Sequence, residues 1–86
     1  MRNNEVIIYS QESCMNCIQL KAWLKRHSIQ FIEKDINIKS NFDELHSLGH
    51  NAVPLTSIYK PITNETIEIL GFNKSKLKET LNITES

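Results

Sequence analysis

The sequence lacks an excess of either charge, because ten lysines and arginines balance ten aspartates and glutamates. Proteins that bind nucleic acid or anionic membranes normally carry a surplus of positive charge, so we expect neither partner. No apolar run approaches the roughly 18 residues that span a bilayer. The first residues, Met1–Val6, contain neither the hydrophobic stretch nor the small-residue cleavage site of a secretion signal. Together these absences predict a cytoplasmic protein.

Cysteine is also scarce, and the two that occur are Cys14 and Cys17. Small secreted domains usually contain several disulfides, and this chain could form only one within itself. A reducing cytoplasm argues against a permanent bridge. Zinc and iron–sulfur sites need further ligands, but a second CxxC is missing. The other candidates are expected at the surface: His27, His46 and His50. We therefore predict no metal and no tightly bound cofactor. A two-thiolate metal site shared between subunits is the alternative.

The first half of the chain predicts a strand, a helix and a second strand. Val6–Tyr9 is short, apolar and β-branched, as in a buried strand. From Cys14 to about Ser28, apolar residues recur at helical spacing, and the basic residues between them are expected on a solvated face. Phe31–Ile36 carries bulky residues that suit a second strand. Such a βαβ unit has parallel strands and a right-handed crossover.

The sequence has only two glycines and two prolines, all in its second half. Each of them therefore helps to locate a turn or the end of an element. Ser40 is expected to cap a short helix over Asn41–Leu48, with Gly49 as its C-terminal stop. The apolar residues of that helix fall at helical spacing: Phe42, Leu45 and Leu48. Strands are expected over Leu55–Tyr59 and Thr66–Leu70, joined by turn residues as an antiparallel hairpin.

The end of the chain predicts one more helix. Gly71 breaks the last strand, Asn73 can cap a helix, and Leu77 and Leu81 give that helix an apolar stripe. The element order is then β-α-β-α-β-β-α. This order predicts the α/β class with a mixed four-stranded sheet, in one domain over residues 1–86.

The strand-to-helix junction places Cys14 at a helix N-terminus. Unpaired backbone N–H groups and the helix dipole favour a thiolate there, so we predict Cys14 as the nucleophile. Cys17, one turn further, is the predicted resolving thiol of a redox-active disulfide, and Met15 and Asn16 between them are expected to tune its potential. Tyr9 is expected beneath this loop, either packing or tuning the thiol by a hydrogen bond. The alternative is a pair of buried structural thiols.

A CxxC directly after the first strand of a small chain with this element order resembles the glutaredoxin branch of the thioredoxin superfamily, most closely the NrdH-redoxins. The resemblance extends from Val6 to about Leu81. The matching blocks are Tyr9-Ser10-x-x-x-Cys14-x-x-Cys17, Phe31-x-Glu33-x-Asp35, Leu48-Gly49 with Ala52-Val53-Pro54, and Gly71-Phe72. The family is thioredoxin-like in fold, which agrees with the class predicted from the elements.

The resemblance implies a small dithiol carrier that reduces disulfides and supplies electrons to a class Ib ribonucleotide reductase. It implies recharging by thioredoxin reductase and a monomeric protein. It also implies a cis bond before Pro54, which would expose the Val53 backbone to a substrate peptide. Gly71 and Phe72 would belong to the docking surface, with core packing as the alternative for Phe72.

The chain departs from the glutaredoxin pattern at several points. Gln11-Glu12-Ser13 stands where a Lys-Pro usually precedes the first cysteine, and Glu12 brings the opposite charge. The Gly-Gly and Cys-Asp features that hold glutathione are missing. These losses make glutathione the less expected electron source. Two alternatives stay open: a glutathione-dependent glutaredoxin, and a non-catalytic module of the same fold that binds metal or a partner protein.

Overall fold

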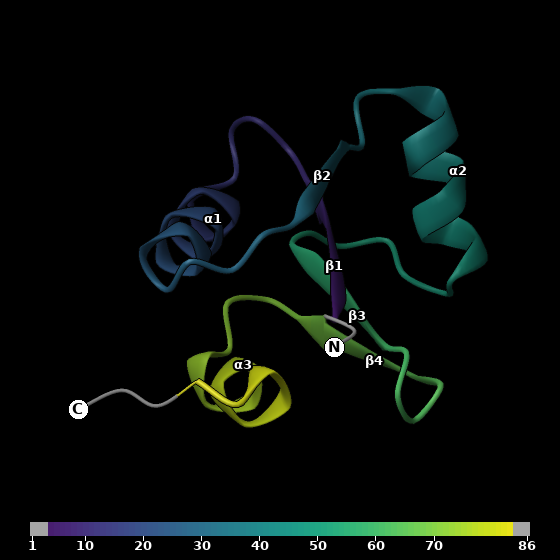
Figure 1. Cartoon of the computed structure of the whole chain (residues 1–86). Coiled ribbons are helices and arrows are strands. Elements are labelled where there is room, and N and C mark those ends of the chain that lie inside the picture. The colour runs from purple at the N-terminus through teal and green to yellow at the C-terminus, as the bar shows by residue number, and fades with distance from the viewer. Residues whose placement is uncertain (1–3, 84–86) are drawn as a thin grey trace.

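The computed structural model describes residues 4–83 and shows a four-stranded sheet with helices on both faces (Figure 1). The strands in chain order are β1 (Glu5–Ser10), β2 (Ile32–Asp35), β3 (Leu55–Lys60) and β4 (Glu65–Leu70). The helices are α1 (Met15–Arg26), α2 (Lys39–Ser47) and α3 (Lys74–Leu81). Helices α1 and α3 cover one face of the sheet and α2 covers the other (Figure 1).

The strands lie in the order β2-β1-β3-β4. Strand β2 runs parallel to β1, while the β1–β3 and β3–β4 pairs are antiparallel. The predicted element order, the mixed four-stranded sheet and the hairpin are therefore confirmed. Among residues 4–83, none of the helices is long and apolar enough to cross a membrane.

Alternation along β1 sends side chains to both faces of the sheet. Val6 and Ile8 join the larger core cluster. Its other buried members are Leu20, Trp23 and Leu24 of α1, Ile58 of β3, Ile69 of β4 and Leu77 of α3. Tyr9 faces the other way and packs with Leu45 of α2 and Leu55 of β3. Trp23 of α1 is only 1% exposed and packs inside this cluster. Since β1 lies between β2 and β3, both layers of the core rest on it.

Several predicted boundaries move by one or two residues. Strand β2 is shorter than the predicted Phe31–Ile36, and Phe31 packs half-buried against the core instead. Helix α1 ends at Arg26 and not at Ser28, because Ser28 has a left-handed φ of 58°. The chain turns there, and the N–H of Ile29 donates to the carbonyl of Leu24 at 2.9 Å.

The predicted start of the second helix was wrong. Helix α2 begins at Lys39, its N-cap is Ile38, and Ser40 lies inside the helix. The turn before it is organised by Asp35: the Asp35 carboxylate accepts from the Asn37 N–H at 2.9 Å, and the Asp35 carbonyl accepts from the Ile38 N–H at 3.1 Å. The predicted stop at Gly49 is confirmed by its φ of 85°, although α2 ends at Ser47, with Leu48 as its C-cap.

Only one of the three apolar residues expected to line α2 is buried. Leu45 is 1% exposed, whereas Phe42 and Leu48 are 41% and 39% exposed. The smaller core on this face of the sheet is built around three residues, so a single leucine of the helix is enough to close it.

The N-cap predicted for the last helix is confirmed. The Asn73 side-chain oxygen accepts a hydrogen bond from the Lys76 N–H at 3.1 Å, and Leu77, one turn into α3, is fully buried. A side-chain cap satisfies one of the N–H groups that a helix start leaves without a partner.

Replacing Asn73 with alanine removes this cap. We expect Asn73→Ala to lower the free energy of unfolding by about 1 kcal/mol, measured by urea denaturation. Asn73→Ser retains a capping oxygen and is the matched control, with a midpoint close to that of the unchanged protein. Equal midpoints for Asn73→Ala and the unchanged protein would contradict the assignment.

Candidate redox site

The two cysteines lie where β1 passes through a short loop into α1. Cys14 is the N-cap of the helix, and its sulfur accepts a hydrogen bond from the Cys17 N–H at 3.1 Å. The Cys14 N–H in turn donates to the carbonyl of Gln11 at 3.1 Å. Cys14 thus occupies the position that serine or aspartate often takes at a helix start. Helix N-termini in general favour nearby negative charge.

The two thiols have different environments. Cys14 is partly exposed, while Cys17 is completely buried. Burial raises the pKa of Cys17 to about 11, with a further increase from its hydrogen bond with Cys14. The backbone of Gln11 and the charge of Lys21 act in the opposite direction. At neutral pH the Cys17 thiol is therefore protonated and shielded, whereas Cys14 remains partly exposed.

The loop before β3 lies directly beside the first cysteine. The Cys14 thiol points to the carbonyl of Val53 at 4.0 Å, and the Val53–Pro54 peptide bond is cis, as the resemblance implied. Pro54 is buried, and its carbonyl accepts from the Gly71 N–H at 2.8 Å. The structure thus brings four of the predicted residues together: Cys14, Val53, Pro54 and Gly71.

Exposed apolar side chains flank this arrangement. Met15 is 64% exposed beside Cys14, and Asn16 is exposed as well. Ile18 and Leu70, which sequence reasoning missed, are also exposed. Leu70 pairs with Leu55, the residue after Pro54. Ile18 lies off the buried stripe of α1, and its position on the helix could have predicted its exposure.

Two roles were open for Tyr9, and its contacts with Leu45 and Leu55 favour packing. Its hydroxyl group does not tune a thiol but donates a hydrogen bond to the Glu44 carboxylate of α2 at 2.5 Å. Burial and this bond hold the pKa of Tyr9 above its usual range. Lys34 binds the same carboxylate at 2.6 Å, and together with Tyr9 it holds the pKa of Glu44 below its usual range. This cluster fastens α2 to β1 and β2.

Phe72 packs against α1. Its ring meets that of Trp23 edge to face at 6.0 Å between centroids, and Lys74 lies 5.6 Å above it. Phe72 also contacts the larger core cluster. These contacts favour the core-packing interpretation of Phe72 over docking.

A second polar cluster, on the α1 side of the sheet, was not predicted. Ser10 donates to the Glu33 carboxylate at 2.6 Å, and the Lys21 ammonium binds the same oxygen at 2.5 Å. Lys21 first, and Ser10 after it, hold the pKa of Glu33 below its usual range. The expectation that the basic residues of α1 form only a solvated face is therefore wrong for Lys21.

The histidines lie apart from the cysteines in separate contacts. His27 caps the far end of α1 against Trp23, with ring centroids 4.6 Å apart, and the exposed His46 lies against Phe42. His50 binds Glu68 at 2.8 Å. Within residues 4–83, no three histidine, cysteine or acidic side chains form a group that could hold a metal ion.

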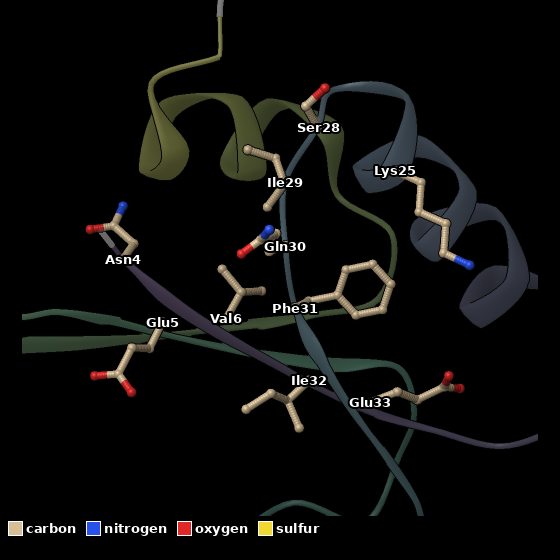
Figure 2. A pocket seen from close by; sticks show the side chains of 10 residues that line it. All are labelled: Asn4, Glu5, Val6, Lys25, Ser28, Ile29, Gln30, Phe31, Ile32 and Glu33. Carbon is tan, nitrogen blue, oxygen red and sulfur yellow. The ribbon is translucent and has the colours of Figure 1, made fainter. Parts of the chain in front are cut away.

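A hollow of about 870 Å³ lies at the other end of β1, where this strand begins (Figure 2). It is bordered by the start of β1, the end of α1 and β2, with Val6, Phe31 and Lys25 among its lining residues. Neither cysteine nor Pro54 lines it. The hollow is therefore separate from the cysteine pair.

Comparison with known proteins agrees with the geometry. The sequence model of the glutaredoxin family matches residues 6–57. The glutaredoxin-like protein NrdH of Lactococcus lactis subsp. cremoris is 33% identical over 73 residues, which cover 84% of this chain and 93% of the relative. Global transcriptional regulator Spx 2 of Bacillus cereus is 48% identical over 44 residues, which are 50% of this chain and 34% of the regulator.

The fold is also shared with solved structures. The NrdH-redoxin of Escherichia coli superposes with a TM-score of 0.72 at 16% identity, over 87% of this chain and 92% of that chain. The sheet of mixed direction with three helices is thus thioredoxin-like. Since the family model covers more than half of the chain and the Lactococcus relative matches nearly all of its own length, the chain belongs to the glutaredoxin family.

Proposed function

We propose that this chain is an NrdH-like dithiol–disulfide oxidoreductase that reduces disulfides of other proteins. The observation that carries the proposal is the asymmetric thiol pair. The Cys14 sulfur is partly exposed and accepts the Cys17 N–H at 3.1 Å, while the Cys17 side chain is completely buried next to it. Such a pair separates the thiol that meets a substrate from the thiol that completes the reaction.

The proposed reaction has two exchange steps. The Cys14 thiolate attacks one sulfur of the partner disulfide, forms a mixed disulfide and releases the other partner sulfur as a thiolate. Cys17 then loses its proton to solvent and attacks the Cys14 sulfur, which releases the second partner thiolate. The partner disulfide gains two electrons, and Cys14 and Cys17 lose two as their disulfide forms. That disulfide is the only redox group the reaction needs.

Substrate contacts are proposed around the exposed thiol. Val53, which precedes the cis bond to Pro54, would offer its backbone to an extended peptide beside Cys14, since the Val53 carbonyl lies 4.0 Å from the thiol. The exposed Met15 and Asn16 would border the peptide, together with Gly71. Apolar surface next to an exposed thiol suits binding to a protein rather than to a small polar disulfide.

The electron source and acceptor are proposed from the resemblance to NrdH. We propose that thioredoxin reductase recharges the Cys14–Cys17 disulfide and that a ribonucleotide reductase is the acceptor. The absence of a basic residue in Gln11-Glu12-Ser13 supports a glutathione-independent protein. We also propose, from the same resemblance to NrdH, that the chain works as a monomeric, single-domain carrier in the cytoplasm.

A second candidate is a redox-responsive interaction module without turnover. The similarity to Spx 2, a transcriptional regulator, favours it, because 44 residues of this chain match at 48% identity. In such a module the same thiol pair would change a binding surface instead of carrying electrons. The exposed Met15, Ile18 and Leu70 around the pair would then be the surface that changes.

Recharging assays distinguish these functions. We expect the purified protein to reduce insulin continuously with NADPH and thioredoxin reductase, and to remain near background with NADPH, glutathione and glutathione reductase. Turnover only with glutathione would contradict the NrdH-like function and favour the glutathione-dependent alternative. No turnover with either system would favour the interaction module.

Removal of the exposed thiol tests its place in the reaction. Cys14→Ser should reduce insulin turnover to the uncatalysed background, because Cys17 is buried and protonated near neutral pH. His46→Gln, an exposed change on α2, is the control and should retain turnover. Substantial turnover by Cys14→Ser would contradict the assignment.

Alkylation measures the difference between the thiols without any partner. At neutral pH, iodoacetamide should label Cys14 and leave Cys17 unmodified in the folded protein, as read by peptide mass spectrometry. The raised pKa of Cys17 keeps this thiol protonated until the pH rises toward about 11, and its side chain has no exposed surface. Urea-unfolded protein is the control and should react at both residues. Equal labelling in the folded protein would contradict the structure.

A further inference from the structure

Lys21 of α1 is joined to the sheet through the carboxylate of Glu33, which Ser10 also binds. Its ammonium binds Glu33 of β2 at 2.5 Å, and the same carboxylate oxygen accepts from the hydroxyl of Ser10 at 2.6 Å. Ser10 is the last residue of β1 and is only 1% exposed. An isolated surface lysine keeps most of its rotamers, whereas this one has a partner that is itself anchored on a buried hydroxyl group.

The position of Lys21 on α1 places it next to the buried thiol. Lys21 follows Cys17 by four residues, so the two side chains are neighbours on one face of the helix. Glu33 pairs with Ile8 of β1 and therefore lies on the sheet face that α1 covers. Figure 2 shows Glu33 and Ile32 on opposite sides of β2, with Lys25 on the same side as Glu33.

The second exchange step requires the buried Cys17 thiol to ionise. Cys17 must become a thiolate inside the protein, where charge is costly. Once Cys14 is tied up in a mixed disulfide, its sulfur no longer carries negative charge. The groups that favour the Cys17 thiolate are then the Gln11 backbone and the Lys21 ammonium, both of which lower the pKa of Cys17.

We propose that Lys21, held by Glu33 and Ser10, is a positioning residue whose ammonium stabilises the Cys17 thiolate while it attacks the Cys14 sulfur. This inference rests on the proposed function and assigns a part of it to a residue outside the CxxC. In the step itself, the Cys17 proton goes to solvent, the Cys14–Cys17 bond forms, and the bond between Cys14 and the partner breaks. The partner sulfur leaves as a thiolate, so electrons and atoms balance.

The two steps can be timed separately with an aromatic disulfide, dithiobis(nitrobenzoate), in a stopped-flow instrument. Attack by Cys14 releases one coloured thiolate at a rate proportional to the reagent concentration. Attack by Cys17 on the resulting mixed disulfide releases the second at a rate independent of that concentration. The first phase reports on Cys14 and the second reports on Cys17.

Lys21→Met retains most of the apolar stem and removes the charge. We expect it to slow the second phase by about threefold or more near neutral pH, and to move the pH profile of that phase upward by about half a pH unit or more. The first phase should stay unchanged, and Lys21→Arg should restore the second. Lys25→Met, one turn further along α1, is the matched control and should change neither phase. An unchanged second phase in Lys21→Met would overturn the inference.

A second measurement needs neither reagent nor partner protein. In a Cys14→Ser background, the titration of an isotope-labelled Cys17 β-carbon by NMR gives the pH at which this thiol ionises. Adding Lys21→Met should raise that pH by about half a unit or more, and the same spectra show that the fold is retained. An unchanged midpoint would overturn the inference, even if insulin turnover by the unsubstituted protein confirms the proposed function. A raised midpoint without insulin turnover would uphold the Lys21–Cys17 coupling while rejecting the proposed function.

Discussion

The proposed thiol chemistry depends on one hydrogen bond, from the Cys17 N–H to the Cys14 sulfur at 3.1 Å. The bond makes a cysteine the N-cap of α1, so the start of the helix is held by the same atom that we propose attacks the substrate. It also fixes the spacing of the pair, because the next turn of the helix carries Cys17 into the core. One thiol faces solvent and the other is shielded as a direct result of where the helix begins.

The central strand β1 leads into the cysteine pair, and two polar clusters join β1 and β2 to the helices on either face. On one face of the sheet, Ser10 and Lys21 share Glu33; on the other, Tyr9 and Lys34 share Glu44. Each carboxylate belongs to a different element, so the clusters tie α1 to β1 and β2 and tie α2 to the same strands. The end of β1 is therefore braced from both sides before the chain enters the CxxC loop. Partly exposed ion pairs contribute little stability by themselves, and their effect here is on the position of side chains next to the site.

Most of the architecture could be predicted from local patterns. The strand-to-helix junction at Cys14, the cap at Asn73 and the stop at Gly49 each depend on a few neighbouring residues, and the structure has all three. Contacts between segments far apart in the sequence could not be predicted from such local patterns. The start of α2 depends on Asp35 at the end of β2, and the partner of Tyr9 lies 35 residues away in Glu44. Lys21 was expected on the solvated face of α1, since nothing in its local sequence indicates an ion pair with Glu33.

The most direct test of the central claim is to trap the mixed disulfide and identify the cysteine that forms it. A Cys17→Ser variant mixed with a disulfide-containing protein should stop after the first exchange, and peptide mass spectrometry should find the partner attached to Cys14. A Cys14→Ser variant treated in the same way should form almost none of this adduct, because the Cys17 side chain has no exposed surface. Adducts formed equally well by both variants would contradict the division of the two thiols into an attacking and a resolving group.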